Sequence, residues 1–172
     1  NPAIKVPNAG RWYYSYQPAR SGQGYASIRY FYNIATAPFS EHIYVPLKEP
    51  LQLGTSYFIR FFVSVDEALT VAEFSDCVGL AFTQNDPYQF VPDGENLKLE
   101  QAIENRGILL TDTIGWTPVS GCYTAQGTEQ FAGIGNFRSE AECMLYQPDL
   151  PGVWPSGLYL YIEDVEVRPF DP

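Results

Sequence analysis

The chain has 172 residues, of which 45% are hydrophobic and 16% aromatic; it is long enough for one domain with a sizeable core and too apolar for a disordered polymer. Its formal net charge is −10, from 20 acidic and 10 basic residues. This balance argues against nucleic acids and anionic membrane surfaces as partners, because both require a basic footprint. No apolar run is long enough to insert into and span a bilayer.

The first half of the chain predicts a loop followed by short strands. Residues 7–22 are rich in Tyr, Gly and Arg and predict a long loop, which strands at 24–32 and 42–46 follow. The strongest predicted strand, 57–65, is β-branched and aromatic. One of its faces is the expected core face, and the other places Arg60 between two phenylalanines. That second face is either a binding surface or a partly covered outer face.

The second half predicts more strands and one helix. Strands are expected at 78–83, 107–110, 116–125, 130–137 and 158–167, each bounded by Gly, Pro, Asn or Asp. Within 130–137, the glycines at 133 and 135 predict close strand packing rather than a phosphate-binding loop. Residues 96–105 are the best candidate for a helix, and 147–157 form a proline-rich loop around Trp154. Many short strands with such punctuation predict an all-β, two-sheet antiparallel sandwich or barrel.

The chain has three cysteines, Cys77, Cys122 and Cys143, which allow one internal bridge and leave one thiol. Cys122–Cys143 is a plausible pair, although spacing does not fix connectivity. A structural zinc site is not expected, since the chain has no C-x-x-C pair and one histidine.

Aromatic side chains in polar loops are the main candidates for ligand binding. Trp12, Tyr13 and Tyr14 are consecutive in the first loop, and Trp154 lies in the proline-rich loop. Sugar rings pack their C–H faces on such side chains, while polar groups such as Arg60 fix the hydroxyls. The alternative is that these rings close the ends of the sandwich.

The evidence for metal binding and catalysis is weaker. Glu163 and Asp164 end an otherwise apolar run, where an acid is costly unless it is exposed, paired or bound to a metal such as calcium. No EF-hand pattern supports the calcium. The lone His42 lies in a predicted strand, and no G-x-S-x-G elbow is present. These two observations argue against nucleophile–base catalysis. A hydrolase with two facing carboxylates is also unfavoured, because acids are ordinary surface residues and the sequence alone does not place two of them opposite each other.

Three segments together carry a family resemblance. Residues 50–65 resemble the L-x-x-G-x-x-Y entry to a central strand in galactose-binding-like jelly rolls. Residues 115–137 follow the order G-W-x-x-V-S-G-x-Y-T-A-x-G-x-E-Q-F and I-G-N-F, and 159–167 contain Y-I-E-D-V-x-V. Residues 6–8 and 19–26 fit the N-terminal half of the same group. Taken together, these segments resemble surface and secreted domains from Bacteroidetes. It is more distantly similar to the family 4, 9 and 22 carbohydrate-binding modules.

The resemblance implies a β-jelly roll within a secreted or cell-surface protein, with residues 1–172 as one module of it. In the carbohydrate-binding modules the acid at the position of Asp164 ligates a structural calcium; the N-terminal N-x-x-F-E segment that supplies its partner is not found before Val6. We expect non-catalytic binding of a polysaccharide or other glycan through Trp12, Tyr13, Tyr14, Arg60 and Trp154. The alternative is a structural or adhesive module that binds protein partners at the cell surface.

Overall fold

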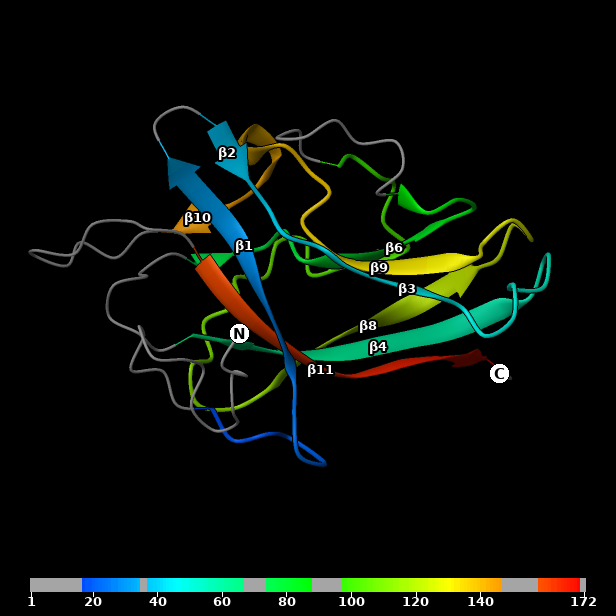
Figure 1. Cartoon of the computed structure of the whole chain (residues 1–172), viewed down its shortest axis with the longest axis horizontal. Helices are drawn as coiled ribbons and strands as arrows, with labels where there is room; N and C mark the ends of the chain where they lie inside the picture. Colours follow the sequence, from blue (N-terminus) through cyan, green and yellow to red (C-terminus); the bar gives the residue numbers. More distant parts are fainter. Residues whose placement is uncertain (1–16, 35–36, 67–73, 88–96, 147–157, 171–172) are drawn as a thin grey trace, which may run out of the picture.

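The computed structural model of the chain describes residues 17–34, 37–66, 74–87, 97–146 and 158–170, which are nearly all β (Figure 1). The larger sheet has five antiparallel strands, in the order β2 (Ala37–Phe39), β1 (Ala26–Ile34), β11 (Leu158–Pro169), β4 (Ser56–Val65) and β8 (Thr117–Thr124). The smaller sheet has four, in the order β3 (Ile43–Pro46), β9 (Phe131–Gly135), β6 (Gly79–Thr83) and β7 (Ile103–Glu104). A separate pair joins β5 (Phe74–Ser75) to β10 (Leu145–Tyr146), and one short 3-10 helix spans Glu140–Glu142. No helix in these described ranges is long and apolar enough to cross a bilayer.

The core lies between the two sheets. The central strand β4 pairs with β11 on one side and β8 on the other, and its inward residues Ile59, Phe61 and Val63 are at most 1% exposed. Their partners from the opposite sheet include Leu80 and Ile134. From β3 onward, and apart from the separate β5–β10 pair, successive strands lie alternately in the smaller and the larger sheet; the exception is β7, which lies in the smaller sheet together with β6. A jelly roll winds in this way. The predicted all-β antiparallel sandwich is confirmed.

The close packing predicted for the glycines of β9 is also confirmed. A Cβ atom on Gly133 would lie 2.0 Å from Cε1 of Tyr44, and one on Gly135 would lie 2.3 Å from Cδ2 of His42. Tyr44 belongs to β3, which pairs with β9, and His42 directly precedes β3. The two rings lie over the glycines of β9, which have no side chains. The ring of His42 also stacks on Phe137 at 5.0 Å. His42 is therefore a packed side chain, and burial lowers the pKa of its imidazole.

Two predictions of secondary structure were wrong. Residues 97–100 have no regular secondary structure, and in place of the predicted helix the segment forms the short strand β7, which pairs with β6. Ile103 of β7 enters the core, at 6% exposure. The strand predicted at 107–110 is not formed: a turn lies at 106–107, with Gly107 at φ 78°, and residues 108–110 follow without regular secondary structure, with Leu110 buried.

The disulfide prediction was wrong as well. Cys77 bonds to Cys143, and Cys122 is an exposed free thiol. Strand alternation explains the difference: Val119 of β8 points into the core, so Cys122, three residues later, points outward. Cys77 has no exposed surface and leads into β6.

A buried polar network lies next to the disulfide. The Arg138 guanidinium donates to the backbone oxygen of Asp76 at 2.5 Å and pairs with Glu104 at 3.1 Å. The carboxylate of Asp76 accepts the backbone N–H groups of Gly107, at 2.8 Å, and Met144, at 2.7 Å. Since a buried charge is costly unless it is paired, this network fixes the segment that carries Cys143.

Candidate functional site

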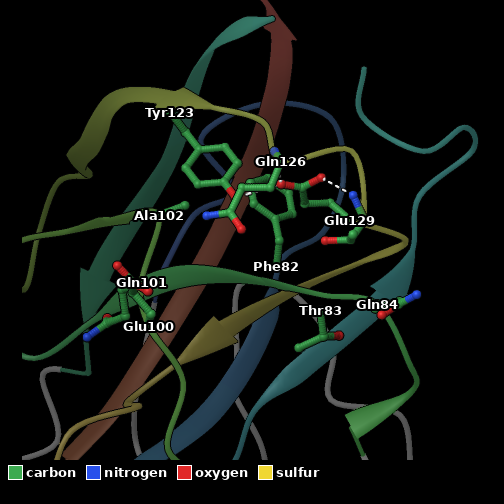
Figure 2. A pocket seen from close by; sticks show the side chains of 10 residues that line it. Phe82, Thr83, Gln84, Glu100, Gln101, Ala102, Tyr123, Gln126 and Glu129 are labelled. Carbon is green, nitrogen blue, oxygen red and sulfur yellow. Dashed lines mark hydrogen bonds between the residues drawn. The ribbon is translucent and has the colours of Figure 1, made fainter. Parts of the chain in front are cut away.

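A polar pocket of about 360 Å³ opens where the two sheets approach each other (Figure 2). It takes residues from the end of β6, from the segment just before β7, and from β8 and the loop between β8 and β9. We call it the glutamine pocket; the residues lining it are Phe82, Thr83, Gln84, Glu100, Gln101, Ala102, Tyr123, Gln126, Thr128 and Glu129.

Two aromatic rings form the apolar part of this pocket. Phe82 comes from β6 and Tyr123 from β8, and their ring centroids are 5.2 Å apart at an interplanar angle of 41°. Both rings are partly buried and pack against the core. Strand pairing in both sheets therefore fixes their position.

Glu129 is the buried carboxylate of the pocket, at 3% exposure. Its Oε1 accepts hydrogen bonds from the Tyr123 hydroxyl and the Gln126 backbone N–H, both at 2.6 Å, and its Oε2 accepts from the Thr128 N–H at 2.8 Å. Burial alone would raise the pKa of the Glu129 carboxyl, but the hydrogen bonds lower it by more than burial raises it. The pKa of Glu129 therefore lies below its usual value. The pKa of the Tyr123 phenol is raised by its burial and by the bond to Glu129. At neutral pH the pair is thus a carboxylate and a neutral phenol.

Glutamine amides form the polar sides. Nε2 of Gln101 donates to Glu104 at 3.0 Å, while its Oε1 is buried with no hydrogen-bond partner. The missing side chain of Gly79 makes room for this amide, because a Cβ atom there would lie 1.8 Å from Oε1. In Figure 2, Gln126 reaches toward the two rings from the β8–β9 loop. Among the described lining residues two are acidic and none is basic.

Arg60, the one predicted ligand-binding side chain that the structure describes, lies outside the glutamine pocket. It stands on the outer face of β4, with its guanidinium 5.2 Å from the centroid of Phe62 and 5.9 Å from that of Phe58. Its Nη2 pairs with Glu166 of β11 at 2.8 Å, and its side chain is 42% exposed. Arg60 is thus held on a partly covered outer face. Trp12, Tyr13, Tyr14 and Trp154 lie outside the described residues.

Asp164, the predicted calcium ligand, is paired with protein groups. It lies at an irregularity in the pairing of β11 with β4, at φ 51°, and forms an ion pair with Arg20. Its Oδ1 accepts the Ser21 hydroxyl at 2.6 Å, and this bond, with the nearby Arg20, lowers the pKa of the Asp164 carboxyl. The adjacent Glu163 accepts the backbone N–H groups of Arg20 and Ser21, each at 2.6 Å.

Both carboxylate oxygens of Asp164 therefore have protein partners in this structure, Arg20 at Oδ2 and Ser21 at Oδ1. Elsewhere in the described ranges there is also no group of three or more His, Cys, Asp or Glu side chains that could hold a metal. We therefore derive no role for calcium from the structure, and the calcium at Asp164 stays a prediction.

The sequence alone did not identify the glutamine pocket. Its residues are ordinary glutamines and glutamates from three separate segments, and no spacing motif joins them. The sequence did contain one signal. Leu97-Lys98-Leu99-Glu100 alternates apolar and charged residues with the period of an extended strand, and in such a strand Gln101 would lie on the same side as the two leucines.

Comparisons with known proteins add little. No protein-family model matches the sequence, and no curated protein sequence matches it. A solved structure described as "PbXyn10C CBM APO" is 14% identical, with a TM-score of 0.37 over 87% of this chain and 70% of that one. Another, described as "CBM4 structure and function", is 12% identical, with a TM-score of 0.37 over 86% of this chain and 95% of that one. At these scores the likeness carries no argument about family or ligand.

Proposed function

We propose that this domain is a non-catalytic carbohydrate-binding module and that the glutamine pocket is its binding site. The observation that carries the proposal is the combination of two fixed rings, Phe82 and Tyr123, with the amides of Gln101 and Gln126 in one pocket. A sugar offers apolar C–H faces to rings and hydroxyl groups to amides, so it matches both parts of the lining. The pocket volume is in the range usual for small ligands, about 300–1,000 Å³.

The state of Glu129 supports binding without catalysis. A general acid for glycoside hydrolysis needs a carboxyl whose pKa is raised, so that it keeps its proton near neutral pH. The pKa of Glu129 is lowered, and its two oxygens already accept three hydrogen bonds. We assign Glu129 the role of holding the pocket wall.

We further propose that the domain works outside the cell, as one module of a larger secreted or cell-surface protein. The Cys77–Cys143 disulfide supports this location, because structural disulfides persist mainly in oxidising compartments. The alternative function is a structural or adhesive module that binds a protein partner. Large apolar side chains are exposed, such as Leu53 at 78% and Ile114 at 84%, and this alternative requires that such side chains form one contiguous patch.

The test is retention on insoluble polysaccharides together with a glycan array. Gln101→Ala and Gln126→Ala each remove hydrogen bonds worth about 0.5–1.5 kcal/mol, so each should weaken binding about 2- to 12-fold. Gln52→Ala is the matched control, because Gln52 is exposed and lies outside the pocket lining. Equal retention of all three variants would exclude the pocket, and Trp12→Ala and Trp154→Ala would then test the loops.

If the domain is retained by no glycan, the carbohydrate proposal fails and the protein-binding alternative becomes the one to pursue. Melting temperatures of all variants must be measured in parallel. A loss of retention counts only when the variant melts within a few degrees of the unmodified domain.

A further inference from the structure

The two main sheets, as far as the structure describes them, have one long open edge. At the other edges β2 has 3 residues, β3 has 4 and β7 has 2. The remaining edge strand, β8, has 8 residues and pairs with β4 without a register shift. Proteins blunt sheet edges with short strands, bulges, charged side chains or proline, because an open edge pairs with other chains. Of these devices, β8 has only Pro118.

The backbone groups on the open side of β8 follow from its pairing with β4. Ala125, just after the strand, donates to Thr55 O at 3.0 Å and accepts from the Gly54 N–H at 2.8 Å. An antiparallel ladder bonds through alternate residues, so the odd-numbered residues of β8 also bond to β4. The even-numbered residues point their backbone groups away from β4; they are Pro118, Ser120, Cys122 and Thr124. In the described part of the chain no backbone hydrogen bond reaches these groups.

This edge is complementary to a second copy of itself. β8 contains no charged residue, in a chain whose formal charge is −10, so two copies of the strand do not repel each other. When two copies run antiparallel about a two-fold axis at Cys122, Ser120 of each copy faces Thr124 of the other. Every backbone N–H and C=O group on the open side of these three residues then meets a partner. Pro118 lies beyond the paired residues, so its missing N–H breaks no bond.

We infer that the domain forms a symmetric dimer in which β8 of one copy pairs with β8 of a second copy, with Cys122 opposite Cys122. About six backbone hydrogen bonds join the copies, because each of the three facing pairs of residues exchanges two. The two five-stranded sheets become one continuous sheet. Since each copy carries a net negative charge, the dimer is more stable when salt screens the repulsion between the copies. The inference is independent of the proposed function, because no glycan takes part.

The first test is the mass of the domain in solution, by sedimentation equilibrium at moderate salt. The reference protein carries Cys122→Ser, so that no disulfide joins two copies, and its mass should rise with concentration from 19.4 kDa towards twice that value. Cys122→Lys places two ammonium groups opposite each other and should weaken dimerisation by about tenfold or more. Gln52→Lys in the reference protein makes the same change of charge at an exposed residue outside β8 and should not weaken it. Lower salt should weaken the dimer of the reference protein.

The second test is cross-linking, which checks the register. In the dimer the two Cys122 Cα atoms lie about 5.5 Å apart, within the range of about 4.4–6.8 Å that a disulfide spans. Glutathione disulfide should therefore link two unmodified copies: the two Cys122 thiols are oxidised to one disulfide, and glutathione disulfide is reduced to two glutathione thiols. The matched control is Thr124→Cys combined with Cys122→Ser. Residue 124 is also exposed, but its two copies lie roughly 13 Å apart along the strands, so this variant should not link.

Each contrary result overturns the inference. A monomer at every concentration and salt excludes the dimer and leaves the edge for an extended segment of another protein. A dimer that Cys122→Lys leaves intact, or that Gln52→Lys weakens equally, has its contact elsewhere. A dimer whose Cys122 residues do not link, or whose control variant links as readily, has a different register. Because Cys122 is exposed, its substitutions should leave the domain folded, which the melting temperature checks.

Discussion

The hydrogen bond between Tyr123 and Glu129 is the contact on which the shape of the glutamine pocket depends most directly, and Tyr123→Phe removes it with little change in volume. A hydrogen bond to a charged group contributes about 1.5–3 kcal/mol. Because Tyr123 is only partly buried, water replaces part of the lost bond, and we expect the free energy of unfolding to fall by about 1–2 kcal/mol at pH 7. For a domain of this size the melting temperature should fall by roughly 2–8 °C.

The pH dependence identifies the partner. The pKa of Glu129 is lower in the folded protein than in the unfolded chain, so its contribution to stability is present above the ordinary glutamate pKa and is lost as the pH falls. The cost of Tyr123→Phe should therefore be full at pH 7 and shrink below about pH 4. Denaturant unfolding of both proteins at several pH values measures this difference.

A matched control is Tyr146→Phe, since Tyr146 is 53% exposed on the short β5–β10 pair. This variant should change the free energy of unfolding by less than about 0.5 kcal/mol. A Tyr123→Phe cost that equals the control, or one that stays constant from pH 7 to pH 3, would refute the assignment of Glu129 as an ionised acceptor.

Three further predictions concern other parts of the fold. Replacing Cys77 and Cys143 together by serine opens a link between residues 66 apart, which should cost about 2–5 kcal/mol in denaturant unfolding. Gly133→Ala forces the ring of Tyr44 to move and should cost about 1–3 kcal/mol; a neutral result would show that the ring does not lie where we place it. Given the partners of Asp164, we expect a calcium chelator at matched ionic strength to leave the melting temperature unchanged, and a lower value would instead support the predicted calcium site.

The sandwich was predictable because the alternation of residues along each strand indicates which face enters the core. In β4 the residues Ile59, Phe61 and Val63 alternate with Phe58 and others, and the structure buries the first set completely. The turn before β4 carries its own signal in Gly54, at φ 76°. Such local information is enough to place a strand and its core face, but it says nothing about which strand lies next to it.

Two of the failed predictions depended on contacts between distant segments. The residues around Ile103 have enough apolar character for a marginal helix, but pairing with β6 offers Ile103 a place in the core and keeps the segment extended. Likewise, the choice of Cys77 over Cys122 as partner of Cys143 follows from where each cysteine lies: Cys122 points outward from β8, whereas Cys77 is fully buried between β5 and β6. Neither outcome can be read from a window of neighbouring residues.

The glutamine pocket was hidden for the same reason, and its order comes from the backbone as well as from side chains. The β8–β9 loop that carries Glu129 is tied to its neighbours by backbone hydrogen bonds: Ala125 O accepts from Gly54 at 2.8 Å, and Gln130 donates to Thr83 O at 2.9 Å. Glu129 then fixes Tyr123 and the Gln126 backbone to the same loop. A wall held in this way loses little conformational entropy when a ligand binds. If the pocket binds a ligand as we propose, the buried carboxylate contributes without touching it, and loss of the carboxylate should weaken binding through disorder of Tyr123 and Gln126.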